Sequence, residues 1–196
     1  MKNKIIFLFL LFMPLASVQA LSVGVDTDGD GLTDEEELNI FFTDVNNKDT
    51  DQDGWLDGVE ARSGWDPNVN EDKKLEKRIE VSLKNQELSF YSGRYKLNSF
   101  KISSGDTKHP TPTGTYSIIV KKPLVTYKGV DYFYPNTKWN LMFKKGTLGN
   151  FYIYGAYWHD NFGKRVSHGC INVAYENMEQ LYNWAEERTS IVISNE

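Results

Sequence analysis

The sequence predicts a mainly β protein with one helix late in the chain, preceded by a small acidic loop module. Short apolar or aromatic segments bounded by turn residues recur from residue 79 onward, as in β-rich domains. Apolar residues recur at helical spacing only in residues 174–187. The charge also changes along the chain: residues 21–72 hold 16 acidic and 2 basic side chains, whereas residues 73–196 hold 11 acidic and 18 basic ones. We therefore expect an acidic module at 21–72 and a basic domain at 73–196.

Residues 1–20 have the pattern of a secretory signal peptide. Lys2 and Lys4 precede an apolar run that is too short to span a bilayer, and small residues lead to Ala20. We expect cleavage after Ala20; a retained N-terminal anchor is the alternative reading. No later apolar run reaches membrane length, so the mature protein is expected in an oxidising compartment such as the periplasm.

The acidic module contains a repeat at an offset of 23 residues. The stretch DTDGDGLTDEEE (26–37) aligns with DTDQDGWLDGVE (49–60). Each copy has carboxylates at positions 1, 3, 5 and 9, a glycine at 6 and a glutamate at 12, which is the spacing of an EF-hand calcium loop. Ca²⁺ prefers six to eight oxygen ligands, and position 7 would offer a backbone carbonyl. The predicted calcium ligands are Asp26, Asp28, Asp30, Leu32, Asp34, Glu37, Asp49, Asp51, Asp53, Trp55, Asp57 and Glu60.

An acidic, disordered tail is the alternative reading of this module, because runs of charge are usually solvated. Two complete matches in a fixed register favour calcium. Since the carboxylates repel one another without a cation, we expect the module to be loose without calcium and ordered with it. Residues 26–67 resemble the thrombospondin type 3-like calcium repeats of bacterial surface proteins and, less closely, dockerin modules. This resemblance implies a spacer or a binding arm.

The strand pattern of the basic domain begins with a hairpin. Residues 79–83 and 87–91 each alternate apolar and polar side chains around a KNQ turn. Residues 174–187 are predicted to be helical because Met178, Leu181 and Ala185 recur on one face. Further strands are expected at residues 95–103, 115–120, 130–135, 139–143, 150–155 and 190–194.

The single cysteine, Cys170, lies in a glycine-containing turn that we place directly before the predicted helix. A lone thiol in an oxidising compartment is best explained as a nucleophile. Free N–H groups upstream of a helix would stabilise its thiolate. Gly169 would let backbone N–H groups converge on one oxygen, as an oxyanion hole requires. A small, buried packing residue is the alternative for Cys170.

Three stretches of the basic domain together resemble the L,D-transpeptidase catalytic domain of bacterial cell-wall enzymes. They are SHGCIN (167–172), YWHDNFG (157–163) and HPTPTGTY (109–116). The resemblance extends over about residues 78–194 and implies a β-sandwich-like fold.

The resemblance also implies a reaction and a set of roles. The cysteine of this family attacks a peptidoglycan stem peptide at the carbonyl of its third residue, a diamino acid. The terminal D-alanine leaves, and an amine from another stem or from a protein resolves the thioester. Carried over to this chain, Cys170 is the nucleophile, and Asn172 fills a position held by Arg or Asn in relatives. The oxyanion region would be shaped by Ser167, His168 and Gly169.

This chain differs from the family at the residue that usually acts as the general base. Family members usually have Ile-His-Gly at the end of the strand before the cysteine loop, whereas this chain has Tyr154 in place of that histidine. We predict His159, beside Asp160, as the base, with a substrate-binding or structural role as the alternative. His109, before a proline, is expected to be a loop residue without chemistry. The predicted substrate-binding residues are Tyr154, Trp158 and Asn172.

The sequence thus predicts a periplasmic cysteine acyltransferase of the L,D-transpeptidase type, without a catalytic cofactor and with structural Ca²⁺ in the acidic module. If water replaces the acceptor amine, the same site becomes an L,D-carboxypeptidase or a hydrolase that detaches a wall-linked protein. A third alternative is an inactive, peptidoglycan-binding domain, because Tyr154 replaces the usual base. The basic domain fits peptidoglycan stem peptides as partners, with a wall-linked or envelope protein as a further candidate, and nothing resembles a nucleic-acid module.

Overall fold

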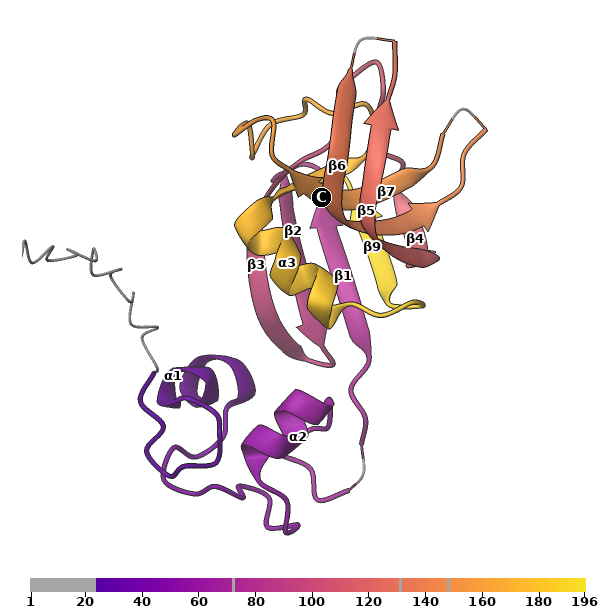
Figure 1. Ribbon diagram of the computed structural model, residues 1–196. Helices are drawn as coiled ribbons and strands as arrows, with labels where there is room; N and C mark the ends of the chain where they lie inside the picture. Colours follow the sequence, from indigo (N-terminus) through magenta and orange to yellow (C-terminus); the bar gives the residue numbers. More distant parts are fainter. Residues whose placement is uncertain (1–23, 72, 131, 148) are drawn as a thin grey trace, which may run out of the picture.

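The computed structural model describes residues 24–71, 73–130, 132–147 and 149–196 (Figure 1). The predicted signal peptide and its cleavage site lie outside these residues. Within them, no helix combines the length and the apolar character that crossing a membrane would require. The helices are α1 (Asp34–Glu36), the π-helix η1 (Glu37–Phe41), α2 (Asp57–Ser63) and α3 (Tyr175–Trp184). The strands are β1 (Lys77–Ser82), β2 (Glu87–Ser92), β3 (Tyr95–Ser103), β4 (Gly114–Ser117), β5 (Val120–Lys128), β6 (Phe133–Lys144), β7 (Phe151–Ala156), β8 (Ile171–Ala174) and β9 (Ser190–Ser194).

The strands form one sheet in the order β4-β9-β1-β2-β3-β8-β7-β6-β5. The pairs β1/β9 and β7/β8 are parallel, and the other neighbours are antiparallel. The two edge strands, β4 and β5, are joined only by Ile118 and Ile119, so the sheet has to curl until its edges meet. The Ile119 N–H accordingly donates to the Met142 carbonyl of β6 at 2.7 Å. The mainly β fold with a helix after the cysteine is confirmed.

Some predicted elements differ from the structure. The hairpin is confirmed as β1 and β2, whereas residues 130–135 and 139–143 belong largely to one long strand, β6. Strand β8 was not predicted, and it separates Cys170 from α3. The strand has only four residues, all of them buried, and such a short segment gives little periodicity to recognise in the sequence.

The main core fills the inside of the curled sheet. Met178 and Leu181 of α3 are fully buried in it, because residues three apart share one face of a helix. In Figure 1, α3 lies against the sheet near β1, β2 and β3. The other members are Ile79, Val81, Leu83, Leu88, Phe90, Phe100, Ile102, Ile118, Leu141, Phe143, Ile153, Ile171, Val173, Ala185, Ile191 and Ile193.

The acidic module, which contains α1 and α2, packs against one end of the sheet (Figure 1). Leu32 and Phe41 of the module form a buried apolar cluster with Leu75 and with Tyr95 of β3. The phenolic hydroxyl of Tyr95 donates to the buried carboxylate of Asp66. The two modules are therefore joined by tertiary packing as well as by the chain.

Candidate active site and calcium loops

Cys170 immediately precedes β8, on the face of the sheet that points away from the main core. Side chains alternate along a strand, so Ile171 and Val173 enter the core while Cys170 and Asn172 face the other way. Asn172 is paired with Tyr154 of the parallel strand β7. Cys170 is half-buried and packs against a cluster of Met142, Tyr152 and Tyr154.

The sulfur of Cys170 is surrounded by hydrogen-bonding groups of β7 and the loop before it. The Tyr154 hydroxyl and the Tyr152 backbone both act on the sulfur in the direction that lowers the pKa of the thiol. The S–H group lies 3.8 Å from the Asn150 carbonyl oxygen and can donate to it. Burial raises the pKa of Cys170 to about 11, and the two donors only partly offset this effect. The thiol is therefore protonated at neutral pH.

The expected stabilisation of a thiolate by the helix N-terminus is wrong. The influence of a helix end fades within about one turn. Strand β8 places four residues between Cys170 and the start of α3. Burial consequently dominates, and an attack by Cys170 requires a group that takes the thiol proton.

The SHG segment before the cysteine is held by a local network of hydrogen bonds. The buried Ser167 hydroxyl donates to the Cys170 carbonyl at 2.5 Å and accepts the Gly169 N–H at 3.1 Å. The Gly169 carbonyl accepts from the Thr111 hydroxyl at 2.8 Å. Gly169 has φ +106°, a conformation that a side chain would strain. Since its N–H is engaged within the loop, the oxyanion role of this segment stays a prediction.

The HPTPTG loop packs against the loop that precedes Cys170, a contact that was not predicted. Its Thr111 is buried against the cysteine loop, and the ring of His109 lies 5.0 Å from that of the exposed His168. Asp106 accepts the His109 backbone N–H at 2.7 Å and lies 3.2 Å from its ring Nδ1. These donors lower the pKa of Asp106. The contact of Thr111 with Gly169 was not predicted, because the two residues are 58 positions apart in the chain.

His159 contacts Asn172. Its Nδ1 accepts the Asn161 N–H at 3.1 Å, so the proton of the neutral ring lies on Nε2. That nitrogen lies 2.9 Å from the Asn172 side-chain amide. The Asn172 Oδ1 is otherwise a buried oxygen without a partner among the described residues, and an amide turned towards Nε2–H would satisfy it. Burial lowers the pKa of His159, which keeps the ring neutral at pH 7.

The predicted base therefore has both ring nitrogens engaged by asparagines, and its role in proton transfer stays a prediction.

Aromatic rings border the cysteine. Trp158 stacks on Tyr134 of β6, with centroids 3.8 Å apart and planes 5° apart, and it lies 5.8 Å from Tyr154. Tyr127 of β5 packs over Tyr154 at 4.6 Å. Trp158 and Tyr154 thus lie together, as expected of substrate-binding residues, although their contact with a substrate stays a prediction. Tyr127 was missed because it belongs to a strand that the sequence pattern did not reveal.

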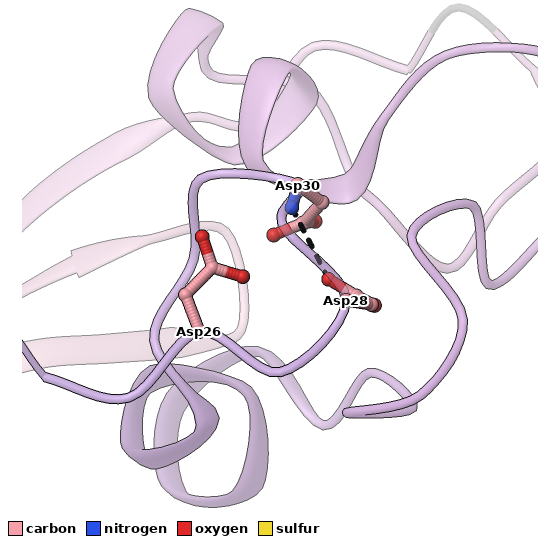
Figure 2. A group of neighbouring side chains, drawn as sticks. All are labelled: Asp26, Asp28 and Asp30. Atoms are coloured by element: carbon pink, nitrogen blue, oxygen red, sulfur yellow. Dashed lines mark hydrogen bonds between the residues drawn. The ribbon is translucent and has the colours of Figure 1, made fainter.

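Three aspartates of each acidic loop converge. Figure 2 shows Asp26, Asp28 and Asp30 around one turn of the chain, with the Asp30 N–H donating to Asp28 Oδ1 at 3.2 Å. One carboxylate oxygen from each of the three lies within 4.8 Å of the others, and the same holds for Asp49, Asp51 and Asp53.

Both loops also contain buried carboxylate oxygens without a hydrogen-bond partner among the described residues. They are Asp28 Oδ2 and Glu37 Oε2 in the first loop, and Asp51 Oδ2 and Glu60 Oε2 in the second. Burial, together with the neighbouring aspartates, raises the pKa of Glu37 and of Glu60 to about 7. Unpaired, buried carboxylate oxygens are costly unless a cation compensates them. The residues at positions 1, 3, 5 and 12 therefore fit a hard divalent cation.

Position 9 has a different role in both loops. The Asp34 carboxylate accepts the backbone N–H and the hydroxyl of Thr27, both at 2.8 Å. Asp57 binds Thr50 in the same way, at 2.9 and 2.6 Å. These aspartates close the loops through protein hydrogen bonds, and their prediction as direct ligands stays untested, as do the carbonyls of Leu32 and Trp55.

The chain thus combines a β domain, whose single cysteine lies in a glycine loop, with a module of acidic loops. The L,D-transpeptidase catalytic domain model matches residues 76–193, more than half of the chain, and the chain belongs to this family. The bacterial TSP3 repeat model matches residues 26–44.

The comparisons with individual proteins agree with this assignment. YqjB of Bacillus subtilis (strain 168), which is assigned to the L,D-transpeptidases, is 28% identical over 104 residues, covering 50% of this chain and 59% of its own length. An L,D-transpeptidase from Mycobacterium smegmatis has a similar fold, with a TM-score of 0.56 and 22% identity over 62% of this chain and 59% of its own. The catalytic domain of the Enterococcus faecium L,D-transpeptidase has a TM-score of 0.53 and is 26% identical in sequence. The match covers 61% of this chain and 97% of that domain. The chain thus spans about three fifths of the curated relative.

Proposed function

We propose that this chain is an exported, periplasmic acyltransferase that acts on peptidoglycan stem peptides through a thioester at Cys170. The sulfur would attack the carbonyl of the third stem residue, and the terminal D-alanine would leave. An amine from another stem would then resolve the thioester. The basic balance of residues 73–196 suits a polymer that carries carboxylates.

One observation carries this proposal: Cys170 is half-buried and packs against polar groups of Tyr152 and Tyr154 that lower the pKa of its thiol, within a domain of the L,D-transpeptidase family. A cysteine that served only as packing would need neither these donors nor the Ser167 network beside it. Tyr154 argues less strongly for an inactive domain than the sequence suggested, because its hydroxyl contacts the sulfur.

The acceptor remains the open part of the proposal. Water in place of the amine would make the enzyme an L,D-carboxypeptidase, or a hydrolase that frees a wall-linked or envelope protein. Because all of these reactions share the thioester, they differ only in what reaches it.

We also propose that Ca²⁺ binds each acidic loop. The support is the pair of unpaired, buried carboxylate oxygens in each loop, beside the three converging aspartates. The ion would order the module, and the bacterial TSP3 match is consistent with this role.

Product analysis tests the proposed reaction. We would incubate the calcium-loaded protein with purified muropeptides that carry tetrapeptide stems, with Cys170→Ala as the matched control. Cross-linked dimers that depend on Cys170 are the expected products, and tripeptides would indicate the water-dependent reaction. Muropeptides that remain unchanged with folded protein would contradict an acyl transfer of any kind.

A further inference from the structure

We propose that Tyr154 is a catalytic residue that transfers the thiol proton of Cys170 during acylation; the proposal rests on the acyl transfer proposed above. Tyr154 lies on β7, opposite Asn172 of the parallel strand β8. Its side chain belongs to the cluster that packs against Cys170 on the outer face of the sheet, and its hydroxyl lowers the pKa of the thiol. The hydroxyl therefore lies beside the reacting atom.

The orientation of Tyr154 is fixed by its neighbours. Its side chain is 6% exposed. Its ring lies 4.6 Å from that of Tyr127, whose own hydroxyl donates to the buried Asn140 Oδ1 at 2.9 Å. Trp158 borders the same ring at 5.8 Å. A side chain held in this way keeps its hydroxyl at the sulfur without further ordering, as catalysis by a positioned group requires.

The buried environment favours a proton transfer that leaves neither the Cys170 sulfur nor the Tyr154 oxygen charged. Burial raises the pKa of Cys170 to about 11, so the thiolate is the minor species at neutral pH. Burial also raises the pKa of Tyr154 well above its usual range, so a phenolate is equally unfavourable. The neutral ring of His159, the predicted base, is engaged by Asn161 and Asn172. A neutral relay through the phenol avoids both buried ions.

The proposed step is balanced. As the sulfur attacks the carbonyl carbon, the C–S bond forms and the S–H proton passes to Tyr154 Oη. The phenolic proton passes to the nitrogen of the leaving group, the C–N bond breaks, and the amine departs neutral with the phenol regenerated. In the second half, the acceptor amine attacks the thioester carbon and a new C–N bond forms while the amine gives a proton to Tyr154 Oη. The phenolic proton returns to the sulfur as the C–S bond breaks.

The test is the rate of acylation of Cys170 by a carbapenem, which offers a strained amide to the same sulfur. Rapid-quench mass spectrometry would follow the adduct on the calcium-loaded protein between pH 5 and pH 9. Tyr154→Phe removes only the hydroxyl and should slow acylation by about 10²–10⁴-fold, the usual contribution of a positioned proton-transfer group. Tyr182→Phe is the matched control, because this tyrosine of α3 packs against the main core; it should acylate at the wild-type rate.

The pH dependence of the acylation rate distinguishes proton transfer by Tyr154 from a purely structural role, which would leave it unchanged. The wild-type rate should show no inflection at the usual histidine pKa of about 6.5, whereas Tyr154→His should recover part of the rate and gain that inflection. A Tyr154→Phe rate within about threefold of wild type would overturn the relay. So would a wild-type inflection near 6.5 that is lost in His159→Gln. A folded wild-type protein that forms no adduct would instead remove the proposed function itself.

Discussion

At the scale of single residues, Ser167 links the nucleophile to the loop before it. Its hydroxyl donates to the Cys170 carbonyl and accepts the Gly169 N–H, and the side chain is 5% exposed. Both hydrogen bonds join residues of the segment 167–170, which ends at the cysteine. The loop conformation that presents Cys170 thus depends on one hydroxyl.

We predict that Ser167→Ala lowers the free energy of unfolding by about 1–3 kcal/mol, because it leaves a buried N–H and a carbonyl without their partner. Urea denaturation measures this loss, and carbapenem acylation of the same sample should also become slower. Ser117→Ala is the control, since Ser117 is exposed on β4. Equal stability of Ser167→Ala and wild type would show that the network does not hold the loop.

The residue types of the site could be predicted from the sequence, but their ionisation could not. The glycine turn and the lone thiol identified Cys170, and the departure at Tyr154 was also visible. The pKa of the thiol depends on burial and on donors from β7, about 20 residues earlier in the chain, which no local pattern reveals. The same is true of Thr111, which reaches Gly169 only through tertiary packing.

At the scale of elements, the two acidic loops are built alike, and this follows from their repeat. In each loop an aspartate accepts hydrogen bonds from a threonine and so closes the turn. Each loop also ends in a buried glutamate. The loops also meet directly: the Gly58 N–H at the start of α2 donates to Asp30 Oδ2 at 2.8 Å. The repeat predicted the loops, whereas the contact between them depends on three-dimensional packing.

The buried glutamates predict how the module responds to pH. Folding raises the pKa of Glu37 and Glu60 to about 7, so the metal-free folded state binds more protons than the unfolded state. Their contribution to stability is present at acidic pH and is lost as the pH rises through about 7. Because Ca²⁺ competes with these protons, its stabilisation should be larger at pH 8 than at pH 5.5.

Thermal unfolding with EDTA or with calcium, at the two pH values, measures this difference. Replacing Glu37 and Glu60 by Gln should reduce the pH dependence, whereas Glu35→Gln, an exposed change on α1, should preserve it. A calcium-induced rise in Tm that is the same at both pH values would show that these glutamates do not bind the ion.

At the scale of the whole molecule, the two modules share a small apolar cluster. Leu32 and Phe41 pack against Leu75 and Tyr95, and beside the cluster lies a cavity of about 730 Å³ lined partly by Arg62 and Lys77. The charge asymmetry predicted two modules, but a contact between them has no signal in the sequence, because its residues are far apart in the chain. The order of the acidic loops should therefore affect the catalytic domain through Leu32 and Phe41.

We predict that EDTA lowers the unfolding temperature of the catalytic domain in the wild-type protein. Phe41→Ala should remove this coupling and cost about 3–5 kcal/mol if the cluster cannot collapse around the gap. Leu38→Ala is the control, because Leu38 is 61% exposed on the same η1 turn. Hydrogen exchange of the β2–β3 hairpin, with and without calcium, reports the coupling. A hairpin that is equally protected in both conditions would contradict it.

If the sulfur of Cys170 is an attacking atom, the intact protein should be acylated at this residue. After incubation with a carbapenem, mass spectrometry with peptide mapping should find one adduct, located on the peptide that contains Cys170, and none in Cys170→Ala. An unmodified Cys170 in protein that is folded and calcium-loaded would contradict the account.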